Sequence, residues 1–278
     1  MTFNVKRLRK GIIAVAVLGG AVYFVPYLAI FFIATGLLDV MRNEKKTRLL
    51  FEKYFLGNGI TVWFLSPVNL LLDLLCYRNR KIYRLEDFPE ESRKEIEDTL
   101  SVFASRKQQV IAQVDDAFDS GRRGMLVYRW YGRQYNDEIA EFNAPFKYLR
   151  TIAVSVFEGN ESTSFHFGPL RLTLRVLYNL TPVESDEIFI ECGRTRHYWH
   201  EDPLFIFDDT LMHRSANNHD GRRYCVFMDV IRPSPVTPLL SVLVVAVSAL
   251  AQGAKGVFYK NWKMLEAGRG SPAAKTRS

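Results

Sequence analysis

From Gly124 to Ile231 the chain is a succession of short runs rich in Val, Ile, Phe, Tyr and Thr. Turn-forming pairs such as Gly159-Asn160 and Asp220-Gly221 separate the runs, and no helical or βαβ-like pattern lies between them. Many short strands at this spacing predict a β-sandwich or a β-barrel. The clearest runs are Met125–Tyr131, Thr151–Phe157, Arg171–Leu180, Glu187–Cys192, Pro203–Phe207 and Tyr224–Ile231.

Residues 11–38 are almost free of charge and follow a basic start. About 20 apolar residues cross a hydrocarbon core, so this segment is long enough to span a bilayer. A signal peptide also begins this way, but the run is longer than a typical signal core and no clear cleavage site follows it. We therefore predict a retained membrane anchor within residues 1–40, kinked at Pro26, with a re-entrant dip as the alternative. Basic residues flank both ends, so the positive-inside rule does not orient it.

A second apolar block covers residues 59–76 and is interrupted at Ser66-Pro67. Proline suits the first turn of a helix, and apolar residues then repeat at helical spacing (Val68, Leu71, Leu72, Leu75). Two interpretations remain open: an interfacial helix lying on the bilayer, or a buried helix packed on the soluble domain. We assign residues 41–84 to this juxtamembrane helical region.

Residues 85–117 carry apolar positions at helical spacing among many charges, which predicts an amphipathic helix or helix pair. We expect these helices to lead into the β region and form one catalytic domain over residues 85–233. The remaining segment, residues 234–278, begins with an apolar stretch and ends in a basic tail. Its apolar part, residues 236–256, is borderline for a span, and surface or half-inserted anchoring is equally compatible with it.

Charge and cysteine usage narrow the class of partner and the compartment. The net charge is +7, and much of the basic excess flanks the apolar segments, which suits an anionic membrane surface. No nucleic-acid-binding motif accompanies it, so we expect no nucleic-acid partner. The three cysteines (Cys76, Cys192, Cys225) show neither disulfide-framework nor zinc spacing, which favours reduced thiols facing a cytosol.

Two histidines and an arginine stand out within the β region. His166 and His213 lie 47 residues apart (213 − 166), each at the edge of a predicted strand, and Arg223 follows ten residues later (223 − 213). Neutral imidazoles bind first-row metals, and two histidines with open positions are typical of non-haem Fe(II) sites. A jelly roll brings such distant residues together, and a guanidinium holds a carboxylate through two hydrogen bonds. Together they predict a metal site beside a carboxylate site, as chelation of 2-oxoglutarate requires.

The motifs around these residues resemble those of the aspartyl/asparaginyl β-hydroxylase family of Fe(II)/2-oxoglutarate oxygenases, which includes lipid A 2-hydroxylase-like membrane proteins. The resemblance covers about residues 150–233. A looser similarity to the membrane lipid hydroxylases extends to Ser66-Pro67-Val68-Asn69. The matching motifs are His166-Phe167-Gly168-Pro169, Leu174-Arg175, Phe207-Asp208-Asp209 with His213, and the strand from Arg223 to Asp229-Val230.

The resemblance implies a mainly β catalytic domain, a double-stranded β-helix (jelly roll, cupin-like), with N-terminal helices and membrane-anchoring segments. It implies that His166 and His213 ligate Fe(II) and that O2 and 2-oxoglutarate are cosubstrates. Arg223 and Ser155 would hold the distal carboxylate of 2-oxoglutarate, and Arg175 would lie near its iron-bound end.

Two positions depart from the usual pattern. A facial triad has a carboxylate two residues after the first histidine, where this chain has Gly168. The peptide-hydroxylating branch of the family also has glycine there. A histidine often found two residues after Arg175 is replaced by Leu177. Asp208 and Asp209 are candidates to orient His213 or an iron-bound water, and structural hydrogen bonding at a strand end explains them equally well.

The combined pattern predicts a membrane-anchored Fe(II)- and 2-oxoglutarate-dependent hydroxylase that acts on the acyl chain of a membrane lipid, either lipid A-like or amino-acid-containing. We expect the catalytic domain to face the cytoplasm at a bacterial inner membrane. The first alternative is a peptidyl aspartate/asparagine β-hydroxylase, which would also be compatible with an endoplasmic-reticulum membrane. The second is a jelly-roll binding module without catalytic activity.

Overall fold

The computed structural model describes residues 25–119, 121–251 and 262–265, together with positions 12, 15, 16, 19, 20 and 23. The basic N-terminus, most of the predicted anchor before Pro26, the end of the apolar segment after residue 251 and the basic tail lie outside the described residues. The described part contains twelve strands: β1 Ile82–Tyr83, β2 Arg123–Trp130, β3 Arg133–Gln134, β4 Leu149–Phe157, β5 Glu161–Ser162, β6 Thr173–Asn179, β7 Ile188–Cys192, β8 Thr195–Tyr198, β9 Leu204–Phe207, β10 His213–Asn217, β11 Arg223–Ile231 and β12 Lys263–Leu265.

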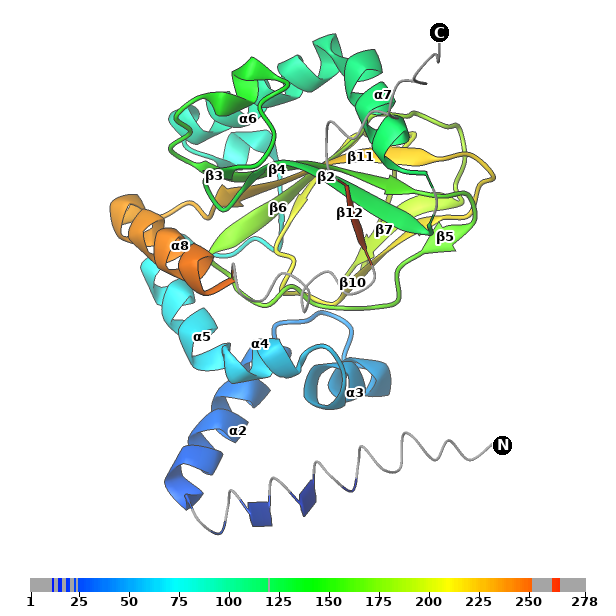
Figure 1. The fold of residues 1–278 in the computed structure, drawn as a ribbon. Coiled ribbons are helices and arrows are strands. Elements are labelled where there is room, and N and C mark those ends of the chain that lie inside the picture. Colours follow the sequence, from blue (N-terminus) through cyan, green and yellow to red (C-terminus); the bar gives the residue numbers. More distant parts are fainter. Residues whose placement is uncertain are drawn as a thin grey trace, which may run out of the picture.

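The strands form two sheets that face each other. The larger has the order β1-β9-β6-β11-β4-β2-β12, with β3 paired to β2, and the smaller has the order β5-β10-β7-β8. From β4 to β11 the chain passes repeatedly between the sheets, so that β5, β7, β8 and β10 belong to the smaller sheet and the other four to the larger. The result is a cupin-like β-sandwich, which confirms the predicted mainly β fold (Figure 1).

Alternation along the strands separates two cores. On β11, Tyr224, Val226 and Met228 pack against the helices, whereas Cys225 and Phe227 point between the sheets. The helices concerned are α6 (Glu90–Ser105) and α7 (Lys107–Ala117), which cover the outer face of the larger sheet (Figure 1). Both lie in the region predicted to be helical. Since β11 is buried on both faces, it reads as a nearly continuous apolar run in the sequence.

Four N-terminal helices pack on the opposite end of the sandwich: α2 (Pro26–Val40), α3 (Arg48–Leu56), α4 (Ile60–Phe64) and α5 (Ser66–Leu75). A C-terminal helix, α8 (Thr237–Ala251), lies against α5 and β11 through Leu240 and Val244. None of the helices that the structure describes is both long enough and apolar enough to cross a membrane. The second apolar block is divided between α4 and α5. One face of α5 is buried through Leu72, while Leu74 on another face is 84% exposed.

A buried network of ion pairs joins the helices to the sandwich. The guanidinium of Arg171 is fully buried and bonds to the carboxylates of Asp39 on α2 and Asp73 on α5. Arg42, just after α2, binds Asp208 at 2.7 Å beside it. Although burial opposes ionisation, Arg42 and Arg171 hold the pKa of Asp208 well below its usual range. Separation of the helices from the sandwich would leave these buried charges unpaired, so the network holds the helices in place.

This network predicts a large loss of stability for Arg171→Met. Removal of one member of a buried ion pair leaves the other unpaired, so we expect the free energy of unfolding to fall by about 3–5 kcal/mol. Arg93→Met, which breaks an exposed pair with Glu97 on α6, is the matched control and should cost under about 1 kcal/mol. Urea unfolding monitored by circular dichroism measures both, and equal losses for the two variants would contradict the structural role of Arg171.

Candidate metal and carboxylate site

The structure brings the two histidines of the predicted metal site into direct contact. His166 follows β5 and His213 begins β10, and each donates its backbone N–H to the carbonyl of the other, at 2.9 and 3.0 Å. Their ring centroids lie 4.2 Å apart. Because the chain alternates between the two sheets, two histidines that are 47 positions apart in sequence (213 − 166) lie in direct contact.

Hydrogen bonds set the orientation of both imidazoles. Nδ1 of His166 lies 2.8 Å from the carbonyl oxygen of Ser164, and Nδ1 of His213 lies 2.8 Å from that of Leu211. A carbonyl only accepts, so both Nδ1 atoms carry the proton and both Nε2 lone pairs remain available. Burial lowers the pKa of His166 to about 4 and that of His213 well below its usual value. Both rings are therefore neutral at neutral pH, which is the form that binds metal.

A carboxylate occupies the space beside Gly168. A Cβ atom placed on this glycine would lie 2.3 Å from Oδ2 of Asp209, and the Gly168 N–H donates to the Asp209 carbonyl at 2.7 Å. The space that a side chain at position 168 would need is thus occupied by a carboxylate from the β9–β10 connection. Across the part of the chain that the structure describes, no three His, Cys, Asp or Glu side chains are arranged to hold a metal ion by themselves.

Arg175 on β6 connects this carboxylate to the larger sheet. Its guanidinium bonds to Asp209 and to Asp229, each at 2.8 Å, and lies 3.6 Å from the ring centroid of Phe227. Burial raises the pKa of Asp209 to about 7, with Arg175 opposing the shift. Arg175 therefore lies on the histidine side of the sandwich interior, with two carboxylate partners.

Arg223, the first residue of β11, is buried without a carboxylate. It is 3% exposed, and its Nη2 donates a hydrogen bond of 2.9 Å to the hydroxyl of Ser215. Nε and Nη1 are buried and have no hydrogen-bond partner among the described residues. The guanidinium lies near the rings of Phe157 and Trp199, at 4.5 and 5.5 Å from their centroids. Burial lowers its pKa, and two N–H groups remain available to an anion.

The strand register relates this arginine to the histidines. His213 and Ser215 are two residues apart on β10, opposite Cys192 and Ile190 of β7, so both side chains point between the sheets. Two residues of a strand span about 7 Å. The guanidinium of Arg223, which bonds to Ser215 through Nη2, therefore lies about one two-residue strand repeat beyond the histidine pair.

The other predicted carboxylate ligand, Ser155, lies on the same inner face of the larger sheet. It stands opposite Cys225 in the β4–β11 register, and its hydroxyl donates to the Cys225 carbonyl at 3.1 Å. Leu177 is packed in the core between the sheets, so the position that often carries histidine is apolar here. Sequence reasoning missed Ser215 and Trp199. The spacing of Ser215 from His213 could have identified it, whereas nothing in the local sequence singles out Trp199.

Asparagines of the helical layer hold both histidine segments. Asn58 and Asn69 donate to the carbonyls of Phe167 and Pro169, each at 3.3 Å. Asn43 accepts from the backbone N–H of Met212 at 2.8 Å. Side chains from the predicted juxtamembrane region thus support the backbone on either side of the histidine pair. This contribution was also missed, because it depends on contacts between residues at least 100 positions apart in sequence.

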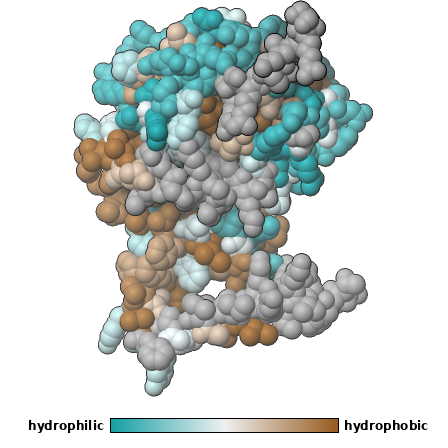
Figure 2. Space-filling model, in the orientation of Figure 1, coloured by the Kyte–Doolittle hydropathy of each residue, from teal (hydrophilic) through white to brown (hydrophobic). Residues whose placement is uncertain are grey.

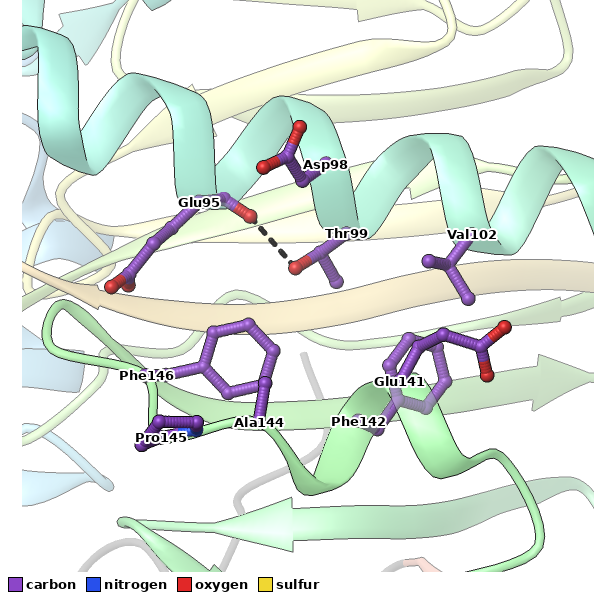
Figure 3. Close-up of a pocket in the computed structure, with 9 residues that line it drawn as sticks. All are labelled: Glu95, Asp98, Thr99, Val102, Glu141, Phe142, Ala144, Pro145 and Phe146. Carbon is purple, nitrogen blue, oxygen red and sulfur yellow. Dashed lines mark hydrogen bonds between the residues drawn. The ribbon is translucent and has the colours of Figure 1, made fainter.

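A surface cavity of about 270 Å³ lies elsewhere, between α6 and the turn at residues 140–146 (Figure 3). Its most buried acid, Glu95, accepts from the backbone N–H groups of Lys147, Tyr148 and Leu149 at 2.7–3.0 Å. The helix forming this cavity packs on the outer face of the larger sheet, away from the histidines. Glu95 therefore has a structural role in anchoring the start of β4.

Comparison with known proteins agrees with this geometry. Residues 91–233, just over half of the chain, match the aspartyl/asparaginyl beta-hydroxylase family. The chain belongs to this family. It is therefore a member of a family of 2-oxoglutarate- and Fe(II)-dependent hydroxylases, as the motifs predicted.

A curated relative, an ornithine lipid ester-linked acyl 2-hydroxylase of Rhizobium tropici, is 31% identical over 86 residues, which is 31% of this chain and 31% of that protein. The match thus spans about a third of the relative's length. Solved structures give weaker likenesses. A 2OG-Fe(II) oxygenase family protein of Burkholderia pseudomallei has a TM-score of 0.26 at 11% identity, covering 34% of this chain and 49% of that one. A predicted oxalate decarboxylase of Thermotoga maritima has a TM-score of 0.26 at 13% identity, covering 40% and 83%.

The contact between Gly168 and Asp209 predicts a specific rescue. Gly168→Asp alone places a second carboxylate against the first, and overpacking of this kind costs about 1–3 kcal/mol before charge repulsion is added. Combining it with Asp209→Ala vacates the space, so the double variant should recover most of the loss in the free energy of unfolding. Combination with Asp137→Ala, which removes an exposed carboxylate, is the control and should recover nothing. Additive effects of the Gly168 and Asp209 substitutions would show that the two positions do not share the space.

Proposed function

We propose that this protein uses Fe(II), O2 and 2-oxoglutarate to hydroxylate the acyl chain of a membrane lipid. The observation that carries the cosubstrate assignment is Arg223, a buried guanidinium with two unpaired N–H groups about one strand repeat from two neutral imidazoles. A buried cation without a counter-charge is costly, so its persistence in the fold favours an anionic ligand at this point.

In this proposal His166 and His213 hold Fe(II) through their Nε2 atoms, which the carbonyls at Nδ1 keep unprotonated. When bound, the iron supplies the oxidative chemistry: O2 and 2-oxoglutarate become succinate and carbon dioxide as one C–H bond becomes C–OH. Arg175 keeps the carboxylate of Asp209 beside Gly168, on the histidine side of the interior. Asp209 supplies an acidic group at that edge of the site, beside the glycine at position 168.

Arg223 pairs with the distal carboxylate of 2-oxoglutarate, with the Ser215 hydroxyl fixing one edge of its guanidinium. Ser155 lies beside this position on β4. The sandwich interior around these groups is lined by buried aromatic residues of β9, Phe205 and Phe207. Such a lining excludes water and strengthens the ion pair between the carboxylate and the guanidinium.

Two observations support a membrane lipid as substrate. The partly matching relative from Rhizobium tropici is an ornithine lipid acyl hydroxylase. The helices that support the histidine segments also carry exposed apolar side chains, such as Leu71 and Leu74 on α5. We place the catalytic domain at the cytoplasmic surface of a bacterial inner membrane. Gly168 favours a second candidate, hydroxylation of Asp or Asn in peptides.

The cosubstrate assignment predicts a selective effect of Arg223→Met. Loss of a buried charged hydrogen bond costs about 2–5 kcal/mol, so the KM for 2-oxoglutarate should rise at least about 30-fold. The adjacent Arg222→Met, which removes surface pairs with Glu158 and Asp115, should leave the KM unchanged. Succinate release with added Fe(II) is the measurement. His213→Ala or removal of iron by a chelator should abolish it, and a protein that never releases succinate would be a binding module instead.

The substrate assignment predicts a mass change in membrane lipids. Cells expressing the protein should contain lipids heavier by one oxygen on an acyl chain, and cells expressing His213→Ala should lack them. Mass spectrometry of total lipid extracts makes this comparison. An unchanged lipid profile together with hydroxylated Asp or Asn in cellular peptides would favour the second candidate.

A further inference from the structure

Helices far apart in sequence place apolar side chains on one side of the molecule. Figure 2 shows brown residues over α8 and, below it, over α5 and α2, whereas teal residues cover the upper part of the molecule. We call this region the apolar docking surface, and we propose that it docks the protein onto a lipid bilayer. Its exposed members are Tyr27, Leu28, Ile30 and Phe31 on α2, Val68, Leu71 and Leu74 on α5, and Leu239, Val242 and Val245 on α8.

The strongest argument is the exposure of α2. The helix carries no charge before Asp39, and its first turns are largely exposed: Tyr27 by 88%, Leu28 by 52% and Ile30 by 59%, with the small Ala29 buried between them. A helix that is apolar all round is stable only when apolar material surrounds it. A protein partner covers one side of such a helix, whereas lipid covers every side. The part of α2 from Pro26 to Phe31 therefore favours hydrocarbon as its surroundings.

The second half of α2 is fixed to the rest of the protein. Gly36 allows close approach of the Trp63 ring, which would clash with any Cβ there at 2.2 Å. The indole N–H of Trp63 donates to the Phe32 carbonyl at 2.8 Å, and Ser66 bonds to Thr35 at 3.0 Å. The exposed end of α2 thus projects from a rigid base (Figure 1).

α5 and α8 continue the docking surface beside that base. Leu72 on α5 and Leu240 and Val244 on α8 share one buried cluster, which holds the two helices together. On a helix packed against a soluble domain, the outward face normally carries polar residues. Here the outward faces carry Leu74, exposed by 84%, and Val242, exposed by 65%. The apolar C-terminal segment thus covers the sandwich with one face and offers the other to lipid.

Basic residues border the docking surface and match anionic head groups. Arg78 is exposed three residues after α5 (78 − 75). Arg150 bonds to Ser241 of α8 at 3.1 Å. Cationic side chains at the edge of an apolar surface add attraction to an anionic membrane.

Docking of this surface on a bilayer would hold the catalytic site at the membrane. Only this connection between docking and catalysis rests on the proposed function. Asn69, which donates to the Pro169 carbonyl after His166, belongs to α5, one of the helices that carry the docking surface. The segment after His166 is thus joined through α5 to the surface that contacts the bilayer. The docking itself is independent of catalysis.

The test is flotation of the full-length protein with vesicles of phosphatidylcholine and phosphatidylglycerol after removal of detergent. Leu71→Glu combined with Val242→Glu should lower the partition coefficient roughly tenfold or more, because each places a charge against hydrocarbon. Ala104→Glu combined with Gln109→Glu adds the same charge at exposed positions of α6 and α7 and should change it less than twofold. An unchanged thermal midpoint shows that each variant is folded.

Equal flotation of the two double variants, or a wild-type protein that stays with the aqueous fraction, would overturn the proposal. The surface would instead be assigned to a second copy of the chain if two results came together. The wild type would be a dimer and the docking-surface variant a monomer in light scattering, and neither would bind lipid. Succinate release is measured on the same samples. Its absence would count against the proposed function and leave the docking result unaffected.

Discussion

Buried guanidinium groups require hydrogen-bonding partners, and three arginines of this protein meet this requirement to different degrees. Arg171 binds carboxylates of α2 and α5, and Arg175 binds two carboxylates inside the sandwich. Arg223 has a single hydroxyl partner and no carboxylate among the described residues. The first arrangement holds the layers together, and the second lies on the histidine side of the interior. The third leaves a cationic group that a ligand carboxylate can complete.

The helical layer is part of the site as well as its support. Its asparagines hold the backbone beside each histidine, and its buried carboxylates hold Arg171, two residues after Pro169. The same helices turn apolar side chains outward. Support of the histidine pair and the apolar docking surface therefore reside in the same helical layer.

Much of the fold was predictable because its signals are local. The composition and spacing of short apolar runs identified the β-sandwich, and helical spacing of apolar residues identified α6 and α7. Motif spacing singled out His166, His213 and Arg223. Other features could not be predicted. Position 168 carries glycine where the usual pattern has an acid. The carboxylate of Asp209 occupies the space beside this glycine, and a hydrogen bond from the Gly168 N–H to the Asp209 carbonyl joins the two segments. A one-dimensional pattern reports which groups are missing and cannot report which distant group replaces them.

The sequence by itself determined the family chemistry: two imidazoles, a guanidinium and strands to carry them, because side-chain type and alternation are properties of the chain alone. Only the tertiary structure decided which charges are paired. It gave Arg175 two carboxylates and left Arg223 with unpaired N–H groups beside Ser215. The physical reason is that the cost of a buried charge depends on what the fold places around it, and these neighbours come from strands that meet only when the two sheets close.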